Sequence, residues 1–178
     1  MKKSEIRKKI IKLRKKNYSK DIKINFQSII KILRKKKQTK KIVGGYFAYN
    51  YEVSVMPILE KFKQLNYITA IPKIGKKYDM NFFLWSINDP LNINKYGIPE
   101  PITNKITYPD ILLVPLVAYD EERNRIGYGG GFYDRYIKKI KKFKKVLTIG
   151  IAFSYQKVKK IPIEKNDIKL DFIITEKN

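Results

Sequence analysis

The stretch ILLVPLVAYDEERNRIGYGGGFYDRYIKKI, residues 111–140, changes character twice along its length. It begins as a nearly continuous apolar run, which predicts a buried strand. It then passes through Gly127 and the glycines of 129–131, and ends in apolar side chains at helical spacing, from Tyr133 to Ile140. Because glycine adopts backbone conformations that other residues avoid, we expect the junction to form a tight turn or to approach a ligand closely.

The alternation of strands and helices extends in both directions from this stretch. Further strands are predicted at residues 41–49, 67–74, 81–85, 146–153 and 171–175, and helices at 4–17, with Ser4 as the expected cap, 21–36, 55–65 and 132–143. The segment 86–109, rich in Asn, Pro and Gly, is predicted to be a surface loop. Continuous apolar strands separated by helices imply an α/β fold whose mostly parallel sheet is covered on both faces, and residues 1–178 are expected to form a single domain.

The composition narrows the chemistry that is available. The chain has no cysteine and no histidine, which excludes disulfides, thiolate nucleophiles, imidazole bases and imidazole metal ligands. What remains is Asp, Glu, Lys, Arg, Tyr, the backbone amides, and a hard cation such as magnesium, which prefers oxygen ligands. These groups suit phosphoryl transfer, in which positioning and charge neutralisation dominate.

The chain carries 40 basic and 16 acidic residues, a net charge of +24. Such a charge raises the question of nucleic acid. The lysines, however, are spread over most of the chain and accompany abundant Ile, Asn and Tyr, a mixture that AT-rich codons produce in any protein. We therefore predict that most of the charge is solvated helix surface and do not expect nucleic acid as a partner.

Nothing in the sequence predicts a membrane protein. The apolar run 111–119 is too short to cross a bilayer and is interrupted by Pro115. The N-terminal residues MKKSEIRKK are charged and do not lead into an apolar signal-like segment. We expect a cytoplasmic protein without a membrane partner.

The glycine segment departs from the familiar phosphate-loop motifs. Phe132 stands where a dinucleotide fingerprint needs its third glycine, and no Gly-Lys-Ser/Thr follows for a P-loop. The glycines still lie just before a predicted helix N-terminus, which attracts anions, and Arg125 and Arg135 flank them. The alternative is a turn that only needs positive backbone dihedrals, with Asp134 interacting favourably with the helix dipole.

Residues 111–136 closely resemble the signature of the 5-formyltetrahydrofolate cyclo-ligases, in which a strand ending in Val-Pro leads to Arg-Leu-Gly-x-Gly-x-Gly-Tyr-Tyr-Asp. Four other stretches resemble the family in the same order: KKSEIRKKI, YFAYNYEVSVMPIL, YGIPEP and IPIEKNDIKLDFIIT. Together the matches extend from residue 3 to residue 175. The similarity therefore covers nearly the whole chain.

The resemblance implies a three-layer α/β/α sandwich related to the sugar-isomerase and CoA-transferase type of fold. It implies a cytoplasmic ligase of one-carbon metabolism, expected to be a monomer. Its substrates would be ATP and 5-formyltetrahydrofolate, with Mg²⁺ as the cofactor. Its products would be 5,10-methenyltetrahydrofolate, ADP and phosphate.

The resemblance also assigns roles to individual residues. The ATP site would comprise Lys3, Arg7, Arg125, Gly127, Gly129, Gly130, Gly131 and Tyr133, and the catalytic residues would be Arg125, Tyr133, Asp134 and Arg135. The folate site would contain Phe47, against the pterin, and Glu52, accepting pterin N–H bonds; the magnesium-associated carboxylates would be Asp134 and Asp167. Judged from the residues alone, these positions also fit helix surface (Lys3, Arg7), strand core (Phe47) and a turn (Asp167).

The chain departs from the family pattern at two places. The family often continues Glu-Val with Asp-Thr-x-Pro, whereas this chain has Ser54, Val55 and Met56 before its proline, and Phe132 replaces a common tyrosine. Two other functions compete with the cyclo-ligase. A sugar-phosphate isomerase would need a general base, often with histidine involved, and the chain has no histidine. A nucleic-acid-binding module would bind with steep salt dependence and without ATP turnover.

Overall fold

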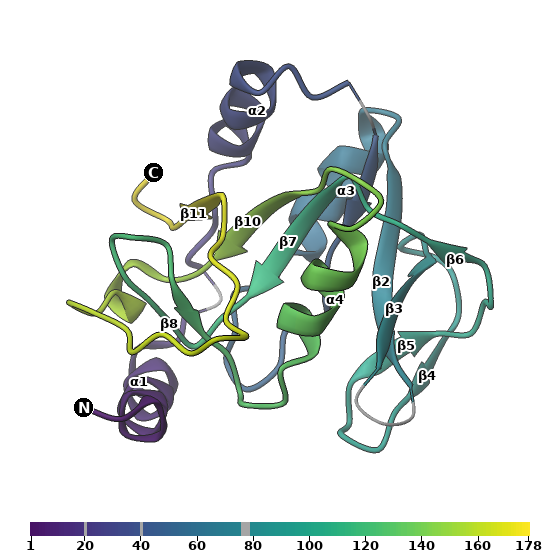
Figure 1. Cartoon of the computed structure of the whole chain (residues 1–178). Coiled ribbons are helices and arrows are strands. Elements are labelled where there is room, and N and C mark those ends of the chain that lie inside the picture. Colours follow the sequence, from purple (N-terminus) through teal and green to yellow (C-terminus); the bar gives the residue numbers. More distant parts are fainter. Residues whose placement is uncertain (20, 40, 76–78) are drawn as a thin grey trace.

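The computed structural model describes residues 1–19, 21–39, 41–75 and 79–178 (Figure 1). Within these residues a seven-stranded sheet has the order β11-β10-β7-β1-β2-β3-β6. The strands from β11 to β2 run parallel, and β3 and β6 are antiparallel to their neighbours. The bounds are β1 (Ile42–Gly44), β2 (Ile68–Ile74), β3 (Met80–Leu84), β6 (Ile106–Thr107), β7 (Ile111–Pro115), β10 (Leu147–Ile151) and β11 (Phe172–Ile174).

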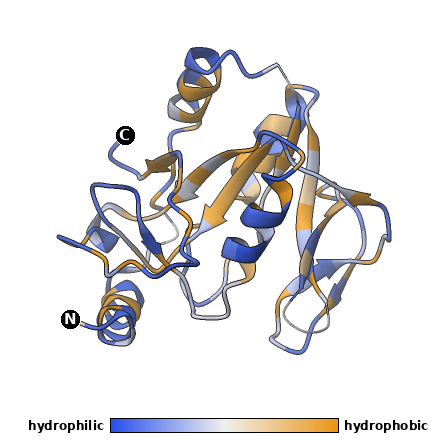
Figure 2. Ribbon diagram, in the orientation of Figure 1, coloured by the Kyte–Doolittle hydropathy of each residue, from blue (hydrophilic) through white to orange (hydrophobic). Residues whose placement is uncertain are grey.

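The described residues contain four α-helices: α1 (Lys3–Asn17), α2 (Phe26–Lys35), α3 (Met56–Gln64) and α4 (Phe132–Ile140). Helices α3 and α4 lie on opposite faces of the sheet (Figure 1). The exposed side of α4 is hydrophilic, whereas the central strands are hydrophobic (Figure 2). This arrangement confirms the predicted α/β class and its helix-covered sheet.

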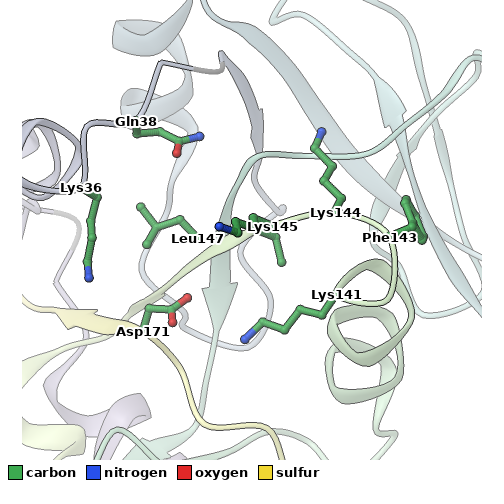
Figure 3. A pocket seen from close by; sticks show the side chains of 9 residues that line it. Lys36, Gln38, Lys141, Phe143, Lys144, Lys145, Leu147 and Asp171 are labelled. Atoms are coloured by element: carbon green, nitrogen blue, oxygen red, sulfur yellow. The ribbon is translucent and has the colours of Figure 1, made fainter.

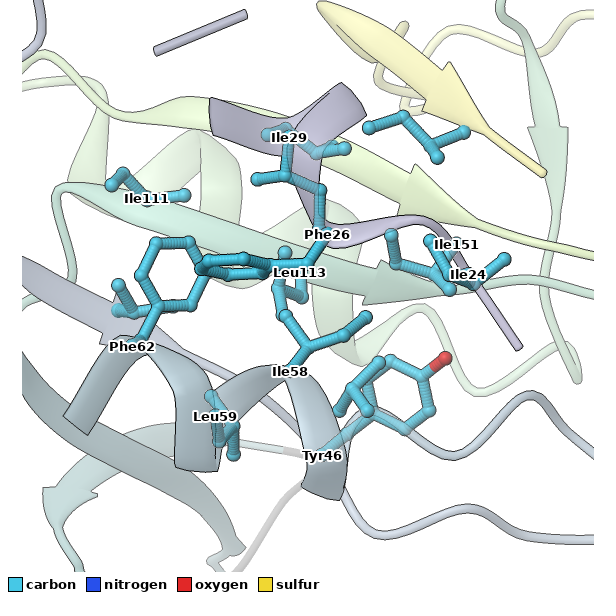
Figure 4. Packing of buried hydrophobic residues seen from close by; sticks show 14 of the residues in the cluster. Ile24, Phe26, Ile29, Tyr46, Ile58, Leu59, Phe62, Ile111, Leu113 and Ile151 are labelled. Atoms are coloured by element: carbon cyan, nitrogen blue, oxygen red, sulfur yellow. The ribbon is translucent and has the colours of Figure 1, made fainter. Parts of the chain in front are cut away.

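Side chains along β7 alternate between the two faces of the sheet, and both faces of this strand are buried. Ile111 and Leu113 belong to the core cluster that includes Phe62 of α3 (Figure 4). Leu112 and Val114 belong to the opposite cluster, which contains the buried side of α4. Because successive strand residues point to opposite faces, a continuous apolar run buries both faces of its strand.

Two predicted helix starts are wrong. The first helix begins at Lys3, one residue before the expected cap Ser4, and the Lys2 backbone N–H donates to Glu5 at 2.8 Å. The second helix begins at Phe26 rather than at residue 21, because the side chain of Asn25 caps it by accepting from the Gln27 N–H at 3.0 Å. Each start is fixed by a local hydrogen bond that the apolar periodicity does not show.

The prediction of a loop at residues 86–109 is also wrong. The segment contains a hairpin, β4 (Leu91–Ile93) and β5 (Pro99–Pro101), as well as β6. Glu100 attaches this hairpin to β2 by accepting a hydrogen bond from the N–H of Ile74 at 2.8 Å. Within the hairpin it also accepts one from the side-chain amide of Asn94 at 2.8 Å. A second hairpin pairs β8 (Ala118–Tyr119) with β9 (Arg125–Ile126).

Among the described residues, no helix combines the length and the apolar character needed to cross a membrane.

Candidate functional site

The order of the strands singles out one edge of the sheet. From β1 the chain crosses through α3 to β2, and from β7 it crosses through α4 to β10 in the other direction. Strands β1 and β7 are parallel neighbours, so the connections diverge outside their carboxyl ends. Ligands of open α/β sheets bind in such a crevice. The segments that enter it are residues 45–55, after β1, and 116–131, after β7.

The glycine segment leaves β9 and reaches the start of α4. Gly129 and Gly131 have φ angles of 102° and 66°, and Gly131 is the N-cap of α4. These positive φ angles explain why glycine stands at both positions. The first-turn amides of α4 have no partner within the helix, and its dipole favours a negative charge there. The glycine segment therefore combines the turn with positive φ angles and the helix start that the sequence predicts.

Helix α1 brings basic side chains onto this segment. Arg7 donates from Nε to the carbonyl of Gly127 at 2.8 Å, and a Cβ atom on Gly129 would lie 3.5 Å from its Nη2. Lys3 lies one turn earlier and forms an ion pair with Asp167 at 2.5 Å. The buried side chains of α1 pack into a small core with β8 and β9. That packing holds the helix against the glycine segment, although the two are distant in sequence.

The two carboxylates predicted to bind magnesium lie on adjoining segments. Asp134 accepts from the N–H of Ile168 at 3.2 Å, and Asp167 precedes Ile168. Each carboxylate also faces a cation. Oδ1 of Asp134 is 2.9 Å from Nη2 of Arg125, and Asp167 pairs with Lys3. In the described part of the chain no three acidic side chains gather as a ready-made cation site.

The remaining residues predicted on the phosphate side differ in exposure. The Arg125 side chain is buried, its guanidinium lies over the Tyr133 ring, and within the described residues its Nη2 makes no aligned hydrogen bond. Arg135 is exposed, donates to the carbonyl of Gly130 at 2.6 Å and lies over the Phe132 ring. The Tyr133 hydroxyl is buried without a partner among the described residues, and burial raises its pKa.

Glu52 occupies a strained turn after β1. Asn50 and Tyr51 both have positive φ angles, 48° and 63°, which residues with a side chain rarely adopt. The turn is closed by the Glu52 N–H, which donates to the Tyr49 carbonyl, and by the Tyr49 N–H, which donates to the Glu52 carboxylate at 2.9 Å. Glu52 is only 5% exposed, and its burial raises its pKa from 4.5 to about 7. The turn and the hydrogen bond from the Tyr49 N–H together hold the buried Glu52 carboxyl in place.

Phe47 follows β1 on the same segment. It is half-buried, its ring lies 5.5 Å from that of Trp85 in an edge-to-face contact, and it packs against the main core. The structure therefore places Phe47 beside Trp85, whereas Glu52 lies near the glycine segment. The folate role of Phe47 stays a prediction.

Two residues at this edge were missed from the sequence. Arg14 is fully buried, and Tyr128 of the glycine segment accepts a short hydrogen bond from it. Tyr128 also donates to the carbonyl of Tyr49 at 3.3 Å and so joins the glycine segment to the Glu52 turn. The available signal was the position of Arg14, which continues the stripe of Ile6 and Ile10 at a spacing of four residues.

A hollow of about 590 Å³ lies elsewhere, at the amino end of β10. Figure 3 shows lysines around it, together with Phe143 and Asp171. Lys144 is paired with Asp110 at 2.8 Å, and Asp171 accepts from the backbone and hydroxyl of Thr148. None of the residues predicted for the site lines this hollow. It lies at the opposite edge of the sheet from the glycine segment.

Strands β1 and β7 form a topological switch point, with a helix start and cationic side chains beside their carboxyl ends. This arrangement defines the class of open α/β proteins, whose ligands generally bind at the carboxyl edge of the sheet. Residues 1–176 match the sequence profile of the 5-formyltetrahydrofolate cyclo-ligase family. The chain belongs to this family of enzymes, and the resemblance seen in its sequence is confirmed.

Similar proteins carry consistent names. The chain is 32% identical over 138 residues to the 5-formyltetrahydrofolate cyclo-ligase of Haemophilus influenzae, covering 73% of each protein. It is 32% identical over 137 residues to that of Mycoplasma genitalium, covering 76% of this chain and 73% of the relative. The structure of 5,10-methenyltetrahydrofolate synthetase from Aquifex aeolicus is similar with a TM-score of 0.77 at 30% identity, covering 100% of this chain and 91% of that one.

Proposed function

We propose that this chain converts 5-formyltetrahydrofolate and ATP into 5,10-methenyltetrahydrofolate, ADP and phosphate. The family of the chain supports the reaction. The observation that carries the proposal is the contact of α1 with the glycine segment through Arg7 and Gly127, next to the Glu52 turn. One crevice thereby offers a cationic helix start for a triphosphate and, beside it, a buried carboxylate for a second ligand.

The need for ATP follows from the chemistry of the formyl group. A formamide carbonyl is stabilised by resonance, and its oxygen is a poor leaving group, so the N10 amine cannot displace it directly. Transfer of the γ-phosphoryl group to that oxygen releases ADP and gives an iminophosphate. N10 then attacks the formyl carbon and releases its proton to water. The carbon–oxygen bond breaks, and phosphate leaves with the oxygen as the new ring closes. Positioning and charge neutralisation are what the protein must supply.

On the phosphate side, the amides at the start of α4 would bind triphosphate oxygens. Lys3 and Arg7 would neutralise their charge from α1, and Arg125 and Arg135 would do so from either end of the glycine segment. Close approach of the triphosphate requires small residues, and the atoms nearest to an added Cβ at Gly129 and Gly131 belong to the guanidinium groups of Arg7 and Arg135. The Tyr133 hydroxyl, which is buried and lacks a partner within the described residues, would gain one from a bound ligand.

Asp134 and Asp167 would hold magnesium. Magnesium is usually bound by one or two carboxylates together with substrate phosphates and water, so two carboxylates on adjoining segments fit its needs. Their present partners, Arg125 and Lys3, would turn toward the phosphates as the carboxylates accept the cation. When bound, magnesium would neutralise charge on the transferring phosphoryl group.

On the folate side, the ionised carboxylate of Glu52 would accept N–H bonds from the pterin, and Phe47 would pack against its ring. The hydrogen bond from the Tyr49 N–H and the strained turn preorganise the carboxylate. The residues after Glu52 depart from the family pattern at Ser54 and Val55, so we assign these two residues no substrate contact.

The proposal is tested by mixing the protein with 5-formyltetrahydrofolate, ATP and magnesium and following the near-ultraviolet absorbance of the methenyl product. ADP and phosphate should appear in equal amounts with the product, and leaving out any one component should stop the reaction. A folded protein that forms no product at several folate concentrations would refute the proposal. ATP turnover without folate would point to a different phosphoryl acceptor.

A further inference from the structure

Arg14 breaks the pattern of its helix. Ile6, Ile10 and Arg14 form the buried side of α1, and the arginine side chain is fully buried. Its guanidinium donates to the Leu116 carbonyl at 3.4 Å and to the Tyr128 hydroxyl, and its Nε has no partner within the described residues. No ion pair involves Arg14 in the described part of the chain. A buried cation is costly unless an opposite charge or a function compensates for it.

The surroundings of Arg14 connect the two halves of the candidate site. Its guanidinium lies 5.5 Å from the ring centre of Tyr128, which belongs to the glycine segment. The Tyr128 ring contacts that of Tyr49 at 5.5 Å, and its hydroxyl donates to the Tyr49 carbonyl. Tyr49 in turn donates its N–H to Glu52. A continuous chain of contacts therefore runs from α1 through the glycine segment to the buried carboxylate.

Four groups interact electrostatically with Glu52: Arg14 of α1, Tyr46 after β1, Tyr128 of the glycine segment and Tyr133 of α4. The pKa values of all three tyrosines are raised, chiefly by burial, so these phenols are neutral near pH 7. Of the four, only Arg14 is charged there. Its charge lowers the pKa of Glu52 against the larger effect of burial.

We propose that Arg14 is a positioning residue, which supplies the counter-charge for the Glu52 carboxylate and holds Tyr128 between the glycine segment and the Glu52 turn. Only the expected effect of Arg14 on folate binding rests on the proposed function. The structural part of the inference, the chain of contacts from Arg14 through Tyr128 and Tyr49 to Glu52, is independent of any substrate.

The first test needs no substrate. In protein labelled with carbon-13 at the glutamate carboxyls, the signal of Glu52 is assigned by its loss in Glu52→Gln, and its titration midpoint is measured. Arg14→Gln removes the charge and keeps a donor, so the midpoint should rise by about one pH unit. Arg14→Lys keeps the charge and should leave the midpoint near that of the unchanged protein. A folded Arg14→Gln protein with an unchanged midpoint would overturn the counter-charge role.

The second test uses turnover. The folate KM should fall as pH rises through the Glu52 midpoint, because the ionised carboxylate is the better acceptor. This fall should move to higher pH in Arg14→Gln but not in Arg14→Lys, whereas a purely structural defect would raise KM without moving the pH dependence. If the unchanged protein makes no product, the proposed function fails, and the titration still decides the role of Arg14.

Tyr128→Phe tests the contact without altering the charge of Arg14. It removes the hydroxyl that Arg14 and the Tyr49 carbonyl share, so the KM values of both ATP and folate should rise, by about fivefold for one lost hydrogen bond. The Glu52 midpoint should change less than in Arg14→Gln. Unchanged KM values for both substrates would overturn the contact role. This test does not depend on whether the Arg14→Gln protein folds.

Discussion

Burial makes the charge of Glu52 depend on pH near neutrality. Its pKa of about 7 lies above the ordinary value of 4.5, because desolvation outweighs the hydrogen bond from Tyr49 and the charge of Arg14. The folded protein therefore binds more protons than the unfolded chain between these two values. Stability from this group is present at low pH, is lost as pH rises from about 4.5 to 7, and stays constant above that range.

Glu52→Gln should remove this dependence. The glutamine side chain keeps an acceptor for the Tyr49 N–H and carries no charge, so the variant should gain stability relative to the unchanged protein as pH rises. The difference between pH 5 and pH 8 should reach up to about 3 kcal/mol, at about 1.4 kcal/mol per unit of pKa shift. Urea unfolding of both proteins at the two pH values measures it. A difference independent of pH would contradict the raised pKa.

Arg7 and Lys8 are neighbours on α1 with opposite surroundings. Arg7 contacts the glycine segment, whereas Lys8 is exposed. Arg7→Ala should raise the ATP KM by about tenfold or more, because a charge-assisted hydrogen bond contributes about 1.5 to 3 kcal/mol. Its folate KM should change less. Lys8→Ala removes the same formal charge and is the control; equal effects of the two substitutions would mean that only the net charge matters.

Asp134→Asn should affect both stability and turnover. The substitution leaves the buried Arg125 side chain without its ion-pair partner, which should reduce the free energy of unfolding by about 1 to 3 kcal/mol. Turnover should fall much further if Asp134 also holds magnesium, and raised magnesium should partly restore it. Asp79→Asn, in an exposed pair with Lys139, is the control and should change stability by less than about 1 kcal/mol. Near-normal turnover of Asp134→Asn at low magnesium would remove its metal role.

At the scale of elements, the start of α4 combines two demands on the backbone. The chain must turn from β9 into the helix, with positive φ angles at Gly129 and Gly131. In the proposed function it must also let a triphosphate approach the first amides of the helix. Glycine meets both demands, and a side chain would oppose both. Gly97 provides a comparison, because it has a φ angle of 75° in a turn between β4 and β5, with no atom within 4 Å of an added Cβ.

Gly129→Ala and Gly97→Ala should therefore cost similar stability, about 1 to 2 kcal/mol each, since both force alanine into a left-handed conformation. Only Gly129→Ala should impair the use of ATP, because its Cβ lies next to Arg7 on the proposed phosphate surface. Thermal unfolding and ATP KM values for the two variants test this. If both variants kept a normal ATP KM, the glycine segment would be a turn without a role in binding phosphate.

At the scale of the whole molecule, a net charge of +24 on 178 residues opposes compaction through self-repulsion. Added sodium chloride should raise the melting temperature from low salt up to physiological ionic strength, where the screening length is about 8 Å. A gain of about 1 kcal/mol would correspond to about 2 to 4 °C at this size. Differential scanning calorimetry measures it, and a melting temperature that falls with salt would show that the ion pairs outweigh the repulsion.

The sequence by itself determined most of the sheet and its covering helices. The apolar runs at β7 and β10 and the helical stripe of α4 are local signals. A strand buried on both faces needs consecutive apolar residues, and a helix buried on one face needs apolar residues three or four positions apart. The glycine segment and its place before a helix were visible for the same reason. Family resemblance then named Glu52, Asp134 and Asp167, which no local pattern distinguishes from other carboxylates.

Only the tertiary structure decided which of these groups meet. Lys3 pairs with Asp167, 164 positions later in the chain. Arg14 is fully buried, although a charged residue is usually exposed to solvent. The β4–β5 hairpin was missed because its strands are too short to show an apolar pattern. It is held by the hydrogen bond of Glu100 to Ile74, in a strand that is distant in sequence. Such contacts depend on the packing of whole elements, since the energy of a long-range pair is realised only after the chain between its members has folded.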